Sequence, residues 1–473
     1  MSELDAIVIG AGPNGLGAAI TLAEAGASVL LIDKFAEPGG ALRSAELTLP
    51  GFVHDLGASV FPLAALSPLI ASSATTNHGL DWSHPAVPAA HPLGDSAVAL
   101  YHDFDQTLEG LGKGAGTYKR LLSAFLESPE ASLEIALGPV FRWPTRPLHT
   151  AGLGARLLIP PRVTATAMRS ASAAALWAGI AAHGVVPLRQ PIAGGFALTL
   201  AAAAHINGWP FAAGGAGSIS RALMARFEAA GGKAEFSTEI NQLNELPPFR
   251  AAFFDTAPEK LVTISQGHLT RRIARRLRNT KRTTSIYKID YALDGPIPWH
   301  DPVSCQAGTV HVGGSFKEIA GSLSETAKGS VPDNPFVIVT QPSVADSTRA
   351  PKGKQVAWAY CHVPFGCEQD MTESIERQIE RFAPGFRDVV LARHAWNLDT
   401  LPGVSPNLVR GDITGGTQGG IYGFRRPTIS TEPWRIPGDR CIYLCSASTP
   451  PGGGVHAMCG VHAANAALHH DLS

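Results

Sequence analysis

An α/β fold is predicted by three observations on this sequence of 473 residues. Near the N-terminus a short apolar run, a glycine-rich turn and a helical stretch follow one another, as in a parallel sheet covered by helices. A second buried-strand pattern then ends on an aspartate. Near the carboxyl end a strand, a glycine turn and a helix again follow one another. Charged residues are only 16% and hydrophobic residues 45% of the chain, a composition that excludes a disordered protein.

The first element is a strand at 6–9 that leads into a glycine turn and a helix at 16–25. The next strand, at 27–32, ends on Asp33. In this context a glycine turn predicts a dinucleotide site, because glycines let a pyrophosphate approach the backbone and the helix N-terminus attracts the phosphates. The terminal acid can accept hydrogen bonds from a ribose. The predicted contacts are Gly10, Gly12, Pro13, Asn14, Gly15, Asp33 and Lys34.

Two further motifs follow the second strand. Gly39, Gly40 and Arg43 make a glycine pair with an arginine that can pair with a phosphate or a flavin edge. The segment after Asp55 adds Gly57, Ala58 and Ser59. With the βαβ unit, these motifs resemble the glutathione-reductase-type FAD fold in the branch of the amine oxidases and phytoene desaturases.

The resemblance implies a Rossmann-like FAD-binding domain with an inserted α+β substrate domain, and FAD as the cofactor. It is strongest with bacterial phytoene-dehydrogenase-like oxidoreductases. It implies that the strand at 441–445 and the turn at 452–454 close the cofactor site, and that the helix after this turn faces the flavin. The implied contacts are Ile240, Ser446, Gly453, Gly454 and Val455.

Three residues depart from the family pattern. Ser446, Ala457 and Arg410 stand where members of the family usually carry glycine. The first two are expected near the flavin, where they can reshape the pocket. The glycines at 214–217 lack a preceding buried strand and a following acid-tipped strand, so we predict no separate NAD(P) domain.

We expect the FAD-binding domain to be assembled from residues 1–70, 205–262 and 405–473. The substrate domain is expected from 71–204 and 263–404, with a helical, apolar cap and a mixed sheet from segments such as 284–293 and 336–344. A strand is expected at 233–240.

Charge is unevenly distributed along the chain. Arg189 is the only charged residue between Ser170 and Ser220, so this stretch predicts interior helices, the wall of an apolar cavity, or a patch that faces a membrane. Residues 271–282 carry seven cations and no acid, which predicts a basic amphipathic helix. The pattern favours a helix whose charged face is exposed to solvent. Docking of this face on anionic lipid is the alternative.

The resemblance implies an FAD-dependent oxidoreductase that acts on C–C or C=C bonds of an apolar, isoprenoid- or enone-like substrate. The catalytic candidates are His456, Tyr422 and His362. A redox-neutral C=C isomerase, an amine oxidase and a non-catalytic flavin-binding interaction protein stay open as alternatives. The expected partner is a small lipophilic substrate, with no nucleic acid and no metal, because the net charge is −1 and neither cysteines nor histidines have ligand spacing. We expect a cytoplasmic protein, with peripheral membrane contact left open, and the sequence does not predict the oligomeric state.

Overall fold

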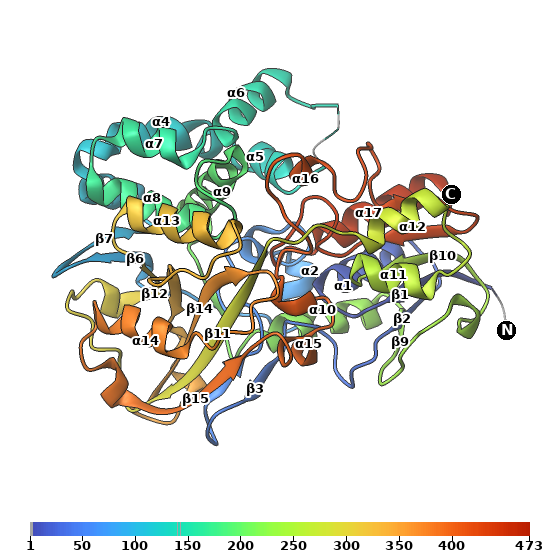
Figure 1. The fold of residues 1–473 in the computed structure, drawn as a ribbon. Helices are drawn as coiled ribbons and strands as arrows, with labels where there is room; N and C mark the ends of the chain where they lie inside the picture. The colour runs from blue at the N-terminus through green and yellow to red at the C-terminus, as the bar shows by residue number, and fades with distance from the viewer. Residues whose placement is uncertain (1–2, 140, 142) are drawn as a thin grey trace.

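The computed structural model describes residues 3–139, 141 and 143–473 (Figure 1). Its N-terminal and C-terminal parts meet in one six-stranded sheet of order β16-β17-β10-β1-β2-β9, in which only β16 runs antiparallel to its neighbour. The strands are β1 (Leu4–Ile9), β2 (Val29–Ile32), β9 (Lys233–Glu235), β10 (Phe249–Phe254), β16 (Arg435–Ile436) and β17 (Cys441–Leu444).

Helices cover both faces of this sheet. One face packs against α1 (Pro13–Glu24), α10 (Gly217–Ala229) and α17 (Met458–His470), and the other against α11 (Pro258–Ile264) and α12 (Arg271–Arg278). The strands have apolar residues on both faces, as sheets buried between helices require. Helices α1 and α17 approach closely, because a Cβ on Gly460 would lie 1.8 Å from the Asn14 carbonyl oxygen.

A second, seven-stranded sheet has the order β15-β11-β14-β13-β12-β6-β7. Its strands are β6 (Val87–Leu93), β7 (Ser96–Leu100), β11 (Thr284–Leu293), β12 (Ala307–Val312), β13 (Val337–Thr340), β14 (Gln355–Pro364) and β15 (Val390–Trp396). Neighbouring strands are antiparallel except β6 and β12. Small two-stranded sheets pair β3 (Ser44–Glu46) with β4 (Val53–Asp55), and β5 (Trp82–Ser83) with β8 (Phe211–Ala212).

Side chains alternate across the seven-stranded sheet, so each face has its own core. One face packs on α14 (Thr372–Glu380) through a cluster that includes Ile375 and Ile379. The opposite face packs on α8 (Ala171–Ala182) and α13 (Phe316–Ala327), beneath a helical cap. The cap also contains α3 (Phe104–Leu111), α4 (Ala115–Leu126), α5 (Pro129–Ala136), α6 (Pro147–Leu157), α7 (Pro161–Met168) and α9 (Pro191–Asn207). Short helices α2 (Ser73–Thr76), α15 (Leu401–Val404) and α16 (Ile421–Phe424) complete the fold.

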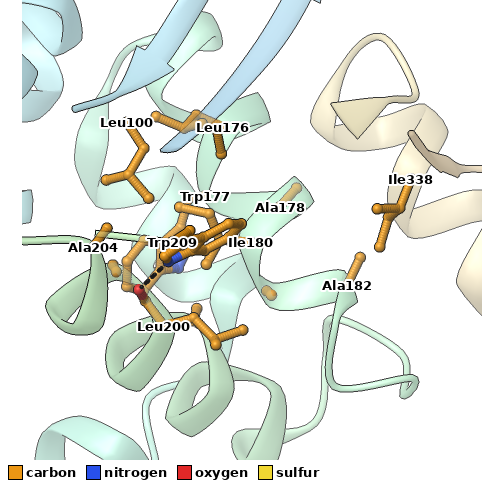
Figure 2. Close-up of a cluster of buried hydrophobic side chains, with 14 of the residues drawn as sticks. Leu100, Leu176, Trp177, Ala178, Ile180, Ala182, Leu200, Ala204, Trp209 and Ile338 are labelled. Carbon is orange, nitrogen blue, oxygen red and sulfur yellow. Dashed lines mark hydrogen bonds between the residues drawn. The ribbon is translucent and has the colours of Figure 1, made fainter. Parts of the chain in front are cut away.

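The stretch without charges forms the buried part of the cap. Ten of the twelve residues of α8 are buried. In Figure 2, Trp177 and Trp209 lie within this core, and the Trp209 Nε1 donates to the Leu200 carbonyl at 3.0 Å. The prediction of interior helices here is confirmed, which accounts for the lack of charge because burying an unpaired charge is costly.

The predicted strand at 233–240 is too long. It ends at Glu235 because Ser237 adopts a left-handed backbone conformation with φ of 55°. The segment expected at 336–344 forms β13 only to Thr340, because Pro342 then opens a 3-10 turn and has no N–H for the ladder. The six- and seven-stranded sheets together confirm the predicted fold class, a Rossmann-like domain with an inserted α+β unit.

Candidate functional site

One cavity of about 520 Å³ runs from the N-terminus of α1 to the seven-stranded sheet. We call its two parts the phosphate-loop end, lined by residues 9–10, 12–14, 32–35 and 238–240, and the sheet end. The sheet end is lined mainly by apolar residues of the cap and the seven-stranded sheet: Val185, Phe196, Leu200, Ile286, Ile338, Trp358, Tyr360, Leu401 and Leu408. A polar end that leads into an apolar end is the arrangement required for a cofactor beside an apolar ligand.

The phosphate-loop end is built on the glycine turn before α1. Gly10 has a φ of 102°, and a Cβ on Gly12 would lie 2.4 Å from the Asp255 Oδ2. Helix α1 starts at Pro13, and its N-cap residue, Gly12, has no side chain to cap it. Asn14 lines the cavity, and its buried Oδ1 has no hydrogen-bond partner among the described residues. The positive end of the helix dipole and an unpaired amide oxygen both suit a bound nucleotide.

Asp33 closes this end of the cavity. Its Oδ2 accepts the Ala11 N–H at 2.6 Å and its Oδ1 accepts the Phe35 N–H at 2.8 Å, so the carboxylate fixes the glycine turn. Each oxygen keeps a lone pair for a further donor. Lys260 lies at the same end and pairs with Glu239 at 3.1 Å. This donor and acceptor set fits the ribose and phosphates of a dinucleotide.

Asp255 follows β10 and is an unforeseen member of the site. Its Oδ2 accepts the Gly15 N–H at 2.9 Å, at the N-terminus of α1. Burial raises the pKa of this carboxyl to about 7; the Gly15 hydrogen bond opposes the rise and the Asp33 charge adds to it. Asn407 holds the Asp255 backbone, with its Nδ2 donating to the Asp255 carbonyl at 2.8 Å.

The glycine pair packs directly on the phosphate loop. A Cβ on Gly40 would lie 3.4 Å from the Gly12 Cα. Arg43 does not line the cavity: its Nε donates to the Gly40 carbonyl at 2.9 Å and its Nη2 to the Val404 carbonyl at 2.6 Å. Arg43 therefore stabilises the loop at Gly40 through hydrogen bonds, without contacting the cavity.

Asp55 joins the two sheets. Its Oδ1 accepts the Ala216 N–H at 2.7 Å, its Oδ2 accepts the Ser59 hydroxyl, and Arg349 pairs with it at 2.7 Å. Burial would raise the pKa of this carboxyl, but Arg349 and the hydrogen bonds outweigh burial and lower it. The Asp55 carbonyl also accepts the Lys288 Nζ at 3.0 Å.

The turn before α17 lines the middle of the cavity through Ser446, Gly453, Gly454 and Val455. His456 points away from the cavity and is buried. Its Nδ1 accepts the Met458 N–H at 3.0 Å, so the ring caps the first turn of α17. Burial lowers its pKa to about 4, which keeps the ring neutral and able to accept.

The sheet end contains a buried lysine. The Lys288 Nζ donates to both oxygens of Asp290, at 2.7 and 2.6 Å, besides the Asp55 carbonyl. It lies 5.3 Å from the centre of the Trp358 ring, which stacks on Tyr360 with ring centres 5.5 Å apart. The three ammonium protons thus have protein partners, and the pair is held in place.

His183 also lines the cavity and belongs to a group of buried imidazoles. Its Nε2 lies 2.9 Å from the His311 Nε2, so one ring donates and the other accepts. Burial lowers the pKa of His183 to about 3 and that of His311 well below its usual value. Both rings are therefore neutral at pH 7.

Most predicted cofactor residues come together in this cavity. Those that line it are Gly10, Gly12, Pro13, Asn14, Asp33, Lys34, Gly40, Gly57, Ala58, Ser59, Ile240, Ser446, Gly453, Gly454 and Val455. Gly15, Gly39 and Arg43 support its wall without lining it. Their contact with a cofactor stays a prediction.

The three predicted catalytic residues lie elsewhere. His456 caps α17, Tyr422 is 44% exposed on α16, and His362 is buried in β14 outside the cavity lining. Sequence reasoning missed several titratable groups that do line it, among them Asp255, Lys260, Lys288 and His183. A lysine inside the apolar strand pattern of β11 is the one signal that was available, because buried lysines are rare without a partner.

Two kinds of feature are absent from the described residues. In this part of the chain no group of three or more His, Cys, Asp or Glu side chains is arranged to hold a metal ion. Over the same residues no helix combines the length and apolar composition needed to span a bilayer.

Comparisons with known proteins agree with this geometry. Residues 8–71 match the NAD(P)-binding Rossmann-like domain. The mouse pyridine nucleotide-disulfide oxidoreductase domain-containing protein 2 is 24% identical, over 98% of this chain and 93% of its own length. Hydroxyneurosporene desaturase of Rubrivivax gelatinosus is 26% identical, over 50% of this chain and 47% of its own.

Among solved structures, a redesigned putrescine oxidase superposes with a TM-score of 0.61 at 14% identity, covering 99% of this chain and 98% of the oxidase. This likeness concerns the fold. The relatives are oxidoreductases, which agrees with the prediction of an enzyme. Homologues of this chain thus include pyridine nucleotide-disulfide oxidoreductase domain proteins and carotenoid desaturases, which confirms the resemblance predicted from its motifs.

Proposed function

We propose that this chain binds FAD along the cavity and dehydrogenates a C–C bond of an apolar, isoprenoid- or enone-like substrate at the sheet end. The observation that carries the proposal is the continuity of the cavity from the phosphate loop to an apolar chamber between sheet and cap. The desaturases among its relatives support the same reaction class.

FAD, when bound, accepts the hydride of such a reaction. The chain would hold its phosphates at the N-terminus of α1 and its ribose at Asp33. The turn at Gly453, Gly454 and Val455 would lie beside the flavin. The apolar wall excludes water from the reacting carbon atoms.

His183 is the cavity group best suited to take the proton that the substrate loses. Its ring is neutral, lines the cavity, and lies 2.9 Å from a second neutral imidazole, that of His311. A weak base suffices here, because removal of a hydride makes the neighbouring C–H acidic. We expect His183→Gln to slow reduction of the flavin without lowering FAD content.

An amine oxidase is the second candidate, favoured by the stacked Trp358 and Tyr360 at the sheet end. The carboxylates argue against it, because Asp290 already pairs with Lys288 and Asp412 with Arg282, which leaves neither as a counter-charge for a cationic amine.

The test is flavin spectroscopy on the purified protein, reconstituted with FAD if necessary, followed by anaerobic titration with polyenes, enones and amines. Bleaching of the flavin by a polyene or enone supports the proposal. Bleaching by amines alone supports the second candidate, and isomerisation without net reduction supports the isomerase. Stoichiometric FAD without reduction by any compound favours a non-catalytic protein, and failure to bind FAD overturns all four readings.

A matched pair of variants tests whether FAD binds at the phosphate-loop end of the cavity. Gly12→Ala places a Cβ 2.4 Å from the Asp255 Oδ2, so we expect it to lower FAD affinity at least tenfold. Gly321→Ala on α13 meets no atom within 4 Å and should leave FAD binding unchanged.

A further inference from the structure

Three hydrogen-bond donors without partners lie at the sheet end of the cavity. Thr309, Thr340 and Trp358 all line it and are 1%, 2% and 8% exposed. The two hydroxyl oxygens and the indole Nε1 have no hydrogen-bond partner within the described part of the chain. Buried polar groups are rarely left unpaired, so these three need an explanation.

The three side chains form one row across the sheet. In the register Thr309 pairs with Thr340 on β13, and Thr340 pairs with Trp358 on β14. Paired residues of neighbouring strands point to the same face and lie about 5 Å apart. The donors therefore form a compact group and not three separate defects.

Their surroundings are apolar. The cavity wall around the row is contributed by side chains such as Val185, Phe196, Leu200 and Ile338. A chamber for a pure hydrocarbon would be more stable with valine or isoleucine in the row, because each buried donor without a partner costs about 1–3 kcal/mol. A ligand atom that accepts hydrogen bonds from these three side chains would remove this cost.

The ligand atom must accept hydrogen bonds, since an indole N–H can only donate. Two carboxylates of the site are already engaged: Asp290 binds Lys288 and Trp396, and Asp412 binds Arg282. The nearby cation, Lys288, has all three protons placed on protein oxygens, so a carboxylate would lack a counter-charge. A neutral oxygen fits better.

We propose that Thr309, Thr340 and Trp358 form a subsite for a carbonyl oxygen, so that the substrate is an apolar ketone or aldehyde and not a plain hydrocarbon. The inference rests on the proposed function and specifies the substrate class of the same cavity.

Binding of a matched pair of probes to the FAD-loaded protein tests the subsite. The probes are geranylacetone and the hydrocarbon in which its carbonyl is a methylene, followed by quenching of tryptophan fluorescence without turnover. We expect the ketone to bind about tenfold more tightly. Equal affinities, tighter binding of the hydrocarbon, or no binding of the ketone would overturn the subsite.

Variants identify the residues responsible. The double variant Thr309→Val, Thr340→Val should lose the preference while binding the hydrocarbon as before, and Thr309→Ser should retain the preference. Thr326→Val is the control, because that buried hydroxyl donates to the His362 carbonyl outside the cavity. A preference that survives in the double variant contradicts the proposal. FAD content, read from flavin absorbance in the same samples, reports on the proposed function independently of the preference.

Discussion

We expect Asp255 to make the binding of FAD depend on pH. Its carboxyl touches the phosphate loop and has a pKa of about 7, with Asp33 as the charged neighbour and the Gly15 N–H as its donor. Above pH 7 the carboxyl is ionised beside the place proposed for the pyrophosphate. We therefore expect FAD affinity to fall as the pH rises from 6 to 8.5, and Asp255→Asn to flatten this dependence. The measurement is FAD titration by fluorescence, with exposed Asp399→Asn as the control.

The same group affects stability with a definite sign. Between its ordinary pKa of 3.8 and about 7 the folded protein holds a proton that the unfolded chain has released, so its contribution to the free energy of unfolding falls as the pH rises. The full effect is on the order of a few kcal/mol. Urea unfolding of apoprotein at pH 5 and pH 8 should show that the stability difference between wild type and Asp255→Asn shifts in favour of the variant as the pH rises. A difference that is the same at both pH values would mean that Asp255 ionises normally.

Arg410 carries backbone strain that a glycine would remove. Its φ is 48° and its side chain is 54% exposed, so little packing is lost on truncation. We expect Arg410→Gly to raise the free energy of unfolding by about 1 kcal/mol. Arg275→Gly, at an exposed site inside α12, should lower it by about as much. Urea denaturation of both variants checks the contrast, and a loss of stability in both would refute it.

At the scale of elements, helix α12 packs one face on the six-stranded sheet and exposes a basic face. Ile273 and Leu277 are buried against the six-stranded sheet, while Arg272 and Arg275 are exposed. The segment beside it exposes Ile421 and Phe424, and the Thr417 N–H ties it to the Lys281 carbonyl at 2.8 Å. Cations next to exposed apolar side chains suit an anionic lipid surface.

We therefore expect the protein to sediment with vesicles that contain phosphatidylserine and less with neutral vesicles. The double variant Arg272→Glu, Arg275→Glu should lose this difference, and so should 0.5 M salt, because charge attraction is screened. Arg387→Glu, in the 3-10 turn Phe386–Val389 and far from α12 in the chain, is the control. Equal sedimentation with both vesicle types would exclude an electrostatic membrane contact.

Elements with local signals could be predicted from the sequence, and pairings between distant segments could not. The turn at 10–15 and strand β2 are specified by adjacent residues, as is α17 apart from its exact start. The row of Thr309, Thr340 and Trp358 exists only because three strands from different parts of the chain pair in one register. His456 adjoins the glycine turn in sequence, yet the direction of its ring depends on capping α17.

At the scale of the whole molecule, buried neutral histidines set the response to acid. Burial lowers the pKa of His54, His91, His205, His362 and His456 to about 4. Each binds a proton in the unfolded chain near pH 6.5 but in the folded protein only near pH 4. Below pH 6.5 the unfolded state therefore gains protons first, and the free energy of unfolding falls.

We expect the thermal midpoint to drop steadily between pH 6.5 and pH 4.5, measured by circular dichroism. His205→Gln should reduce the slope, while a variant at exposed His300, which pairs with Asp95 at the surface, should not. A midpoint that is constant over this range would contradict the neutral state of these rings.

Asp55 has a consequence for how a ligand enters. Its side chain holds Ser59 and the Ala216 N–H beside the six-stranded sheet, Arg349 reaches it from the inserted unit, and its carbonyl binds Lys288 on β11. A hinge opening between the two sheets would have to separate buried opposite charges, at a cost of about 3–5 kcal/mol. Helices α8 and α9 contain no Asp, Glu, Lys or Arg, so their motion separates no such pair. We therefore expect an apolar ligand to enter past α8 and α9, while the two sheets keep their relative positions.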